Sequence, residues 1–315
     1  MSQPAFLIDD VHAALERALV DMRVAVVGDG VRIEQGQGLL RRSVTVAYGE
    51  IVAAYTAAAN TAAANTAAAN TAAANTAAAN TAAASTGTAN TVDPRAWLAA
   101  WARGVLAVLN EPANSKGHTL TFVDCTATLM PALEGPGFVA GVAAVRGDEP
   151  FSTRQPGGLL AVYFVELDQG RRLLSRAQVE GWGVHPERLE KAALSVLFHR
   201  TRHTSPVDDE ADGVTWQRLA VGDGSDSARA LLMDVLEWSR TMSGLWVGVP
   251  SPGVVMYRDV ADDAALAAFQ EQVRRAWLTS ADPLSPDVLR WRSGTLEPAP
   301  CSTPAADAEW TLTEG

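Results

Sequence analysis

Apolar and polar residues alternate along the chain in patterns that predict short helices and strands. Over residues 5–22 the apolar side chains recur every three or four positions, which is typical of an amphipathic helix. Residues 24–35 predict a β-hairpin around Gly28-Asp29-Gly30, because glycine accepts the positive φ of a tight turn. The pattern of residues 43–55 then predicts a short strand followed by a helix.

The middle of the chain opens with a strong helix signal. Asp93 is suited to the N-cap and Pro94 to the first helical position, ahead of an apolar stripe of Trp97, Trp101, Val105, Leu106 and Leu109. Apolar, β-branched content predicts strands around 118–128 and 137–145. The Gly/Pro-rich residues 147–158 are the best candidate for a domain boundary.

The second half carries clearer start and stop signals. Residues 159–168 have the length and apolar content of a strand, Ser175 can cap a short helix, and Pro186 can start a long amphipathic helix. The remaining predicted elements are a loop over 204–213, a strand over 214–221, a helix after a cap at Ser225 or Asp226, a hairpin across Ser251–Pro252, and a helix over 261–280.

These elements predict an α+β protein with two mixed modules, each a small antiparallel sheet flanked by helices. The first module is expected to combine residues 1–55 with 92–147, and residues 158–298 are expected to form the second. Residues 56–91 are predicted to be a low-complexity insertion between the two parts of the first module. Residues 299–315 are predicted to be a disordered tail.

The insertion contains five identical TAAAN copies from Thr56 to Asn80, followed by a TAAAS near-copy. Five residues advance an α-helix by about 500°, or about 140° beyond one full turn, so no stripe of threonines forms on one face. Alanine favours helix, whereas asparagine and threonine each cost about 0.5 kcal/mol relative to it. We therefore expect a helical or disordered spacer that extends the preceding helix and has no chemistry of its own.

Composition and charge narrow the classes of partner. The 315 residues contain 25 Lys and Arg against 36 Asp and Glu, and the net charge of −11 disfavours nucleic acid. No apolar run reaches the length of a membrane span, and the first residues lack a secretory signal pattern. Cys125 and Cys301 lie in no CxxC or zinc-like spacing. These features predict a soluble cytoplasmic protein that binds neither membrane nor cofactor.

Four segments in a fixed order resemble the YtpQ family of bacterial proteins, to which no reaction is assigned. They are the strand–strand–helix unit LLAVYFVELDQGRRLLSRAQVEGWGVHPERLEKAALSVL, then GDGSDSARALLMDVL, then LWVGVPSPGVVMYRDV, and finally SGTLEP. The resemblance covers most of the chain apart from the repeat and the last dozen or so residues. It implies an α+β fold, supplies no catalytic residues, and marks the TAAAN repeat as an insertion.

Two histidines offer the best metal-binding candidate in the sequence. His199 and His203 are four residues apart on a predicted helix, a spacing that places both rings on one face. A third ligand could come from the acidic side chains Asp208, Asp209 and Glu210. The alternative interpretation is that these histidines lie at a solvated helix end, where cationic side chains suit the partial negative charge of the helix terminus.

Two other features could indicate a calcium site or a nucleophilic cysteine, but each has a simpler structural interpretation. The acidic stretch from Asp223 to Ser227 lacks the ligand spacing of a calcium loop, and N-capping explains it better. Cys125 lies in a predicted strand, seven residues after His118 and on the opposite face, so a local dyad is not expected.

Two functions therefore remain open from the sequence. The favoured one is a protein-interaction or chaperone-like module without catalytic activity, in which tryptophans serve as core or interface anchors. The alternative is a metal-dependent hydrolase whose site assembles from His118, His199, His203 and nearby acids.

Overall fold

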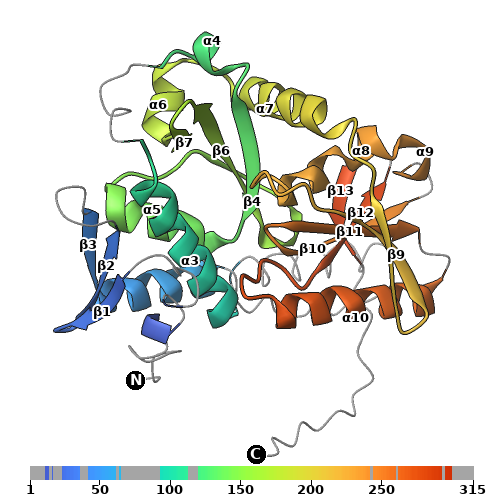
Figure 1. Cartoon of the computed structure of the whole chain (residues 1–315), viewed down its shortest axis with the longest axis horizontal. Helices are drawn as coiled ribbons and strands as arrows, with labels where there is room; N and C mark the ends of the chain where they lie inside the picture. Colours follow the sequence, from blue (N-terminus) through green and yellow to red (C-terminus); the bar gives the residue numbers. More distant parts are fainter. Residues whose placement is uncertain are drawn as a thin grey trace, which may run out of the picture.

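The computed structural model describes residues 11–13, 16, 23–35, 42–61, 64, 93–112, 120–241, 244–259, 262–292 and 295–299. These residues form three antiparallel sheets with helices packed around them, which confirms the predicted α+β class (Figure 1). The sheets have three, four and six strands. The three-stranded sheet lies at one end of the molecule, and the six-stranded sheet lies at the other.

The three-stranded sheet confirms the predicted hairpin and the strand after it. β1 (Arg23–Val27) pairs with β2 (Gly30–Gln35), Gly28 in the turn has φ +63°, and β3 (Arg42–Ala47) pairs with β2. Val31, Ile33 and Val46 from this sheet are buried in one cluster with tryptophans of the helix that follows the repeat. Residues 11–13 and 16 are helical, and the rest of the predicted helix over 5–22 lies outside the described residues.

A helix follows β3 and runs through residues 48–61, so the start of the repeat is helical as predicted. The hydroxyls of Thr56 and Thr61 donate to the carbonyls of Val52 and Ala57, four residues earlier, at 2.8 and 2.9 Å. Such bonds give the hydroxyl of a threonine inside a helix a hydrogen-bond partner within the same helix. Residue 64 is also helical, and the remainder of the repeat lies outside the described residues, as does the predicted tail beyond residue 299.

The strands predicted around 118–128 and 137–145 are wrong. Residues 122–125 form the short helix α4 (Phe122–Cys125), which starts at a capping box between Thr121 and Asp124, and the strand β4 (Leu129–Glu134) begins only afterwards. Residues of the second segment belong to the helix α5 (Pro136–Arg146). Its apolar residues fit a buried strand as well as a helix, because a short continuous apolar run does not reveal its period.

α5 begins with Pro136 at its first helical position and packs closely on another helix. α3 (Pro94–Leu109), capped by Asp93 as predicted, lies against α5 with glycines at the contact. A Cβ at Gly137 would lie 2.2 Å from the carbonyl oxygen of Trp97, and one at Gly141 would lie 2.1 Å from that of Trp101. The glycines therefore let two helix backbones approach each other closely.

The four-stranded sheet confirms the predicted elements of residues 159–201. β6 (Leu160–Leu167) lies at its centre and pairs with β4, β5 (Ser152–Arg154) and β7 (Gly170–Leu173). α6 (Arg176–Gly181) is capped by Ser175, and α7 (Pro186–Thr201) packs on β4. Because β4 and β6 lie on either side of residues 147–158, this sheet spans the predicted domain boundary.

The six-stranded sheet has the order β13-β12-β10-β11-β9-β8. The predicted hairpin of β10 (Leu245–Ser251) and β11 (Val254–Asp259) is confirmed at its centre, and α10 (Asp263–Thr279) covers one face. The other face shares a buried core with the four-stranded sheet. The remaining elements are β8 (Val207–Ala211), β9 (Val214–Leu219), a 3-10 helix η4 (Ser227–Leu232), α8 (Met233–Leu236), α9 (Trp238–Thr241), β12 (Val288–Arg292) and β13 (Thr295–Pro298).

Two sequence predictions in this half are wrong. The segment 204–213 was expected to be a loop, yet residues 207–211 form β8, which pairs with β9 across a turn at Asp212 and Gly213. Both turn residues have positive φ, at 53° and 74°, which suits a tight hairpin turn. The single helix expected after Ser225 or Asp226 is instead the 3-10 helix η4 and two short α-helices.

Candidate functional site

The described residues do not bring the predicted metal ligands together. His199 is exposed in the last turn of α7, where its ring lies 5.9 Å from that of Phe198, and His203 is exposed beyond the helix end. The acidic residues Asp208, Asp209 and Glu210 lie on β8. No group of three or more His, Cys, Asp and Glu among the described residues could hold a metal ion. His118 lies outside the described residues.

Cys125 lies in α4 and not in a strand, and its side chain is fully buried. Burial, and secondarily the charge of Asp124, raise the pKa of its thiol to about 11. The thiol is therefore protonated at neutral pH, whereas a nucleophilic cysteine needs a thiolate. Cys301 lies outside the described residues.

The acidic stretch from Asp223 to Ser227 belongs to a buried ionic network centred on Arg229. The Arg229 side chain is 0 % exposed, and its Nη2 lies 2.7 Å from Asp223 while its Nη1 lies 3.0 Å from Asp226. Its Nε donates to the hydroxyl of Thr201 at 3.0 Å. Asp226 occupies the N-cap position of the helix that follows, as predicted, but its carboxylate accepts from the backbone amides of Val221 and Gly222 and caps no amide of that helix.

The network continues to the end of the four-stranded sheet. Arg171 donates to the backbone carbonyl of Asp223 and forms an ion pair with Glu166 at 2.9 Å. Arg200 from α7 forms a second ion pair with Glu166. Arg229 and Asp226 are buried and paired, as buried ions must be, whereas Arg171, Arg200 and Glu166 are 25–36 % exposed. The network holds the loop before η4 against α7 and β7.

Sequence reasoning missed Arg229, although one signal was available. It is the only charged residue in the apolar run from Ala228 to Met233, where a solvated arginine would be out of place. Next to it, Ser227 accepts from the amide of Leu133 at 3.1 Å and donates to the carbonyl of the same residue at 3.2 Å. These bonds tie η4 to β4, so this cluster serves the structure.

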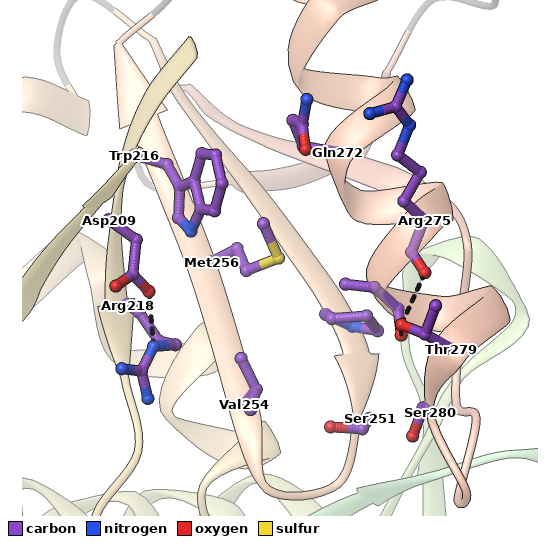
Figure 2. Close-up of a pocket in the computed structure, with 12 residues that line it drawn as sticks. Asp209, Trp216, Arg218, Ser251, Val254, Met256, Gln272, Arg275, Thr279 and Ser280 are labelled. Atoms are coloured by element: carbon purple, nitrogen blue, oxygen red, sulfur yellow. Dashed lines mark hydrogen bonds and ion pairs between the residues drawn. The ribbon is translucent and has the colours of Figure 1, made fainter. Parts of the chain in front are cut away.

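A groove of about 420 Å³ lies between α10 and the strands β8, β9 and β11 (Figure 2). Its floor is Trp216, Val254 and Met256, which share one face of the sheet because Met256 lies opposite Arg218 and side chains alternate along a strand. Figure 2 shows α10, which carries Gln272 and Arg275, across the groove from Trp216. The α10 wall consists of Gln272, Arg275, Ala276 and Thr279, whose spacing places them on one side of a helix.

Ion pairs line the rim of this groove. Arg218 lies 2.5 Å from Asp209, and Arg275 pairs with Glu271 at 3.0 Å and also with Asp212. The side chains of these pairs are 30–62 % exposed, so water screens them and each pair contributes little to stability. An apolar floor bordered by exposed ion pairs is the usual anatomy of a protein-binding surface.

α3 holds the end of α10 that forms one side of the groove. Arg95 donates to the carbonyl of Leu278 at 2.9 Å and also to that of Ser280. These cationic contacts suit the C-terminal end of a helix, where carbonyl groups lack partners. Gly248 on β10 lets α10 approach the sheet, since a Cβ there would lie 2.4 Å from Val273. The wall of the groove is therefore fixed at both its ends.

A second groove of about 460 Å³ lies on the opposite face of β8, β9 and β11. Its polar side chains bond one another: the hydroxyl of Tyr257 donates to Glu237 at 3.0 Å, and Arg240 lies 2.8 Å from Asp259. Burial and the nearby Glu237 carboxylate raise the pKa of Tyr257, which keeps its hydroxyl protonated as a donor. Arg240 also lies over the ring of Tyr257 at 5.3 Å. These mutual bonds make the second groove a weaker candidate than the first.

No protein-family model, curated protein or solved structure matches this chain. The resemblance to the YtpQ family therefore stays a prediction. Among the described residues, no helix combines the length and the apolar character needed to cross a membrane.

Proposed function

We propose that this protein is a protein-interaction module that binds a segment of another protein in the groove between α10 and β9. The observation that carries the proposal is the floor of Trp216, Val254 and Met256 between two rims of ion pairs, in which Trp216 and Val254 are half-buried and Met256 is buried. Tryptophan and methionine are enriched at the centres of interfaces, because they bury a large apolar area. The groove is within the size range of sites that bind side chains or small ligands.

The paired state of the ionisable groups supports binding over catalysis. Near the groove, the arginines and carboxylates neutralise one another, and Arg229 and its partners do so in the interior. A catalytic site would need a titratable group left free to exchange a proton at neutral pH. A metal-dependent hydrolase is not proposed, since His199 and His203 are exposed and no group of three or more metal-ligating side chains occurs among the described residues.

A site-specific crosslinking experiment tests the proposal. A photoreactive benzophenone residue replaces Thr279, which is exposed on the groove side of α10, or Ala267, which is exposed on the same helix but does not line the groove. After irradiation of cells that naturally produce the protein, we expect a discrete adduct with one other protein from position 279 and none from position 267. Equal adducts from both positions would refute the groove as the binding site.

Binding by the purified partner then gives the quantitative test. Thr279→Trp fills the groove without removing a core side chain, and Ala267→Trp places the same bulk on α10 away from it. We expect the first variant to weaken binding at least tenfold and the second to leave the affinity within about twofold. Identical affinities for the two variants would contradict the proposal.

A further inference from the structure

β8 is an end strand of the six-stranded sheet and borders the groove. It pairs with β9 over its whole length, from Val207 opposite Arg218 to Ala211 opposite Val214, without a bulge. Among the described residues, no backbone group outside β9 hydrogen-bonds to β8. Its second edge therefore presents the backbone donors and acceptors that an added strand would use. Figure 1 shows the hairpin that contains β9 at the side of the molecule, away from the three-stranded sheet.

The side chains of β8 differ between its two faces. Asp208 and Glu210 are exposed on one face, whereas Val207 and Asp209 point to the face of the groove. Val207 is 51 % exposed, and Asp209 is already paired with Arg218. A strand beside β8 would thus meet two free carboxylates on one face and an apolar side chain on the other.

Charge argues against a second copy of this chain as the added strand. The hairpin of β8 and β9 carries Asp208, Asp209, Glu210 and Asp212 against the single cation Arg218. Two such edges side by side would bring like charges into opposite positions, which destabilises a strand pair. The net charge of −11 adds to this repulsion. The same carboxylates attract a cationic strand.

We propose, building on the protein-binding function above, that β8 pairs with an extended segment of the partner in which basic and apolar residues alternate. The basic side chains would lie beside Asp208 and Glu210. The apolar side chains would lie on the face of Val207, next to the groove. Backbone hydrogen bonds supply affinity in such strand addition, and the alternating side chains supply specificity.

A labelled peptide of nine residues that alternates Lys and Val is the probe, with fluorescence anisotropy on the full chain as the readout. We expect saturable binding that weakens with salt, and at least tenfold weaker binding by the same peptide with Glu in place of Lys. The double variant Asp208→Asn/Glu210→Gln should lose about fivefold, because two exposed ion pairs contribute roughly 1 kcal/mol in total. The matched control Glu180→Gln/Glu187→Gln removes two exposed carboxylates elsewhere and should leave the affinity unchanged.

Two N-methylated peptides test strand pairing itself. One carries methyl groups on the amides of the odd positions and the other on those of the even positions, so each removes the donors along one edge of the peptide. A strand bonded to β8 on one side keeps its affinity in one of the two peptides and loses it in the other. Equal binding by both peptides, or equal binding by the Lys and Glu probes, would overturn the proposal.

These outcomes are distinguishable from failure of the proposed function. The crosslink at position 279 reports on the groove, and the N-methylated peptides report on the edge of β8. A crosslinked partner together with no selectivity between the two methylated peptides would keep the groove as the binding site and reject strand addition to β8.

Discussion

Replacing Arg229 with methionine removes a buried charge while keeping most of the side-chain length. The guanidinium bonds both carboxylates of Asp223 and Asp226 and the hydroxyl of Thr201, and no part of the side chain is exposed to solvent. Arg229→Met would leave Asp226, which is 1 % exposed, without its cation. Removing one partner of a buried ion pair costs about 3–5 kcal/mol, a large part of the 5–15 kcal/mol that stabilises a typical domain.

Urea unfolding followed by tryptophan fluorescence measures this loss. The midpoint of Arg229→Met should fall by more than about 1 M relative to the unsubstituted protein. Arg275→Met is the matched control, since the same change at an exposed ion pair should cost less than about 1 kcal/mol. Adding Asp226→Asn to Arg229→Met should recover part of the loss, because the uncompensated carboxylate is then removed. Equal midpoints for the two single variants would refute a stabilising role for the network.

The pH dependence gives a second readout of the same network. Burial raises the pKa of Asp223, but the hydrogen bonds and charge of Arg229 outweigh it and hold that pKa below its ordinary value. A carboxylate whose pKa is lowered on folding contributes stability above its unfolded pKa of about 3.9 and loses that contribution as the pH falls further. The stability difference between the unsubstituted protein and Arg229→Met should therefore shrink below about pH 4. A constant difference from pH 7 to pH 3 would contradict this reasoning.

Three other predictions follow from single contacts. Gly141→Ala should destabilise the fold by about 1–3 kcal/mol, because its Cβ would meet the carbonyl of Trp101. Gly181 has open space around it, so Gly181→Ala should be neutral or stabilising. Thermal unfolding of both variants measures the difference. Asp93→Ala should cost about 1 kcal/mol by the same assay, since the carboxylate accepts from an amide in the first turn of α3. Cys125 should resist iodoacetamide at pH 8 in the folded protein and react in urea, as peptide mass mapping would measure; rapid labelling of the folded chain would contradict its burial.

Local signals predicted the elements whose bonds lie within a few residues of one another. Asp93 accepts from an amide three residues later, and Ser175 does the same at the start of α6. Gly28 forms its turn because glycine adopts the required positive φ at low cost. Such features need no knowledge of the rest of the fold, so sequence alone located them correctly.

The failures do not all come from contact with distant residues: α4 begins at a local capping box, α5 begins with Pro136, and β8 pairs with the adjacent strand β9 across a two-residue turn. α5 has Pro136 at its first position and Gly147 with φ +78° at its end, and Gly137 and Gly141 let it pack on the backbone of α3, some forty residues earlier in the chain. β8 is a strand because it pairs with β9 and because its charged residues remain at the edge of the sheet. Propensity is a weak guide where tertiary contacts of this kind decide the conformation.

The groove could not be predicted from short stretches of the sequence. Its floor comes from Trp216, Val254 and Met256 and its wall from α10, so adjacency depends on the order of strands in the sheet. The sequence predicts Asp208, Asp209 and Glu210 as possible metal ligands, yet the structure places them on β8 at the edge of the sheet. The sequence shows which side chains are acidic, but the order of strands in the sheet decides which side chains lie next to them.

The two sets of ion pairs differ in the cost of exchanging partners. Arg229 is enclosed, so breaking its bonds leaves charges in the interior, and the loop that it holds is fixed. Arg218 and Asp209 are 37 % and 30 % exposed, and water can replace either partner at a cost near or below about 1 kcal/mol. In the proposed binding mode, a bound segment would displace the rim pairs of the groove without disturbing the buried network. The sheet and α10 would then keep their positions while the charged side chains around the groove exchange partners.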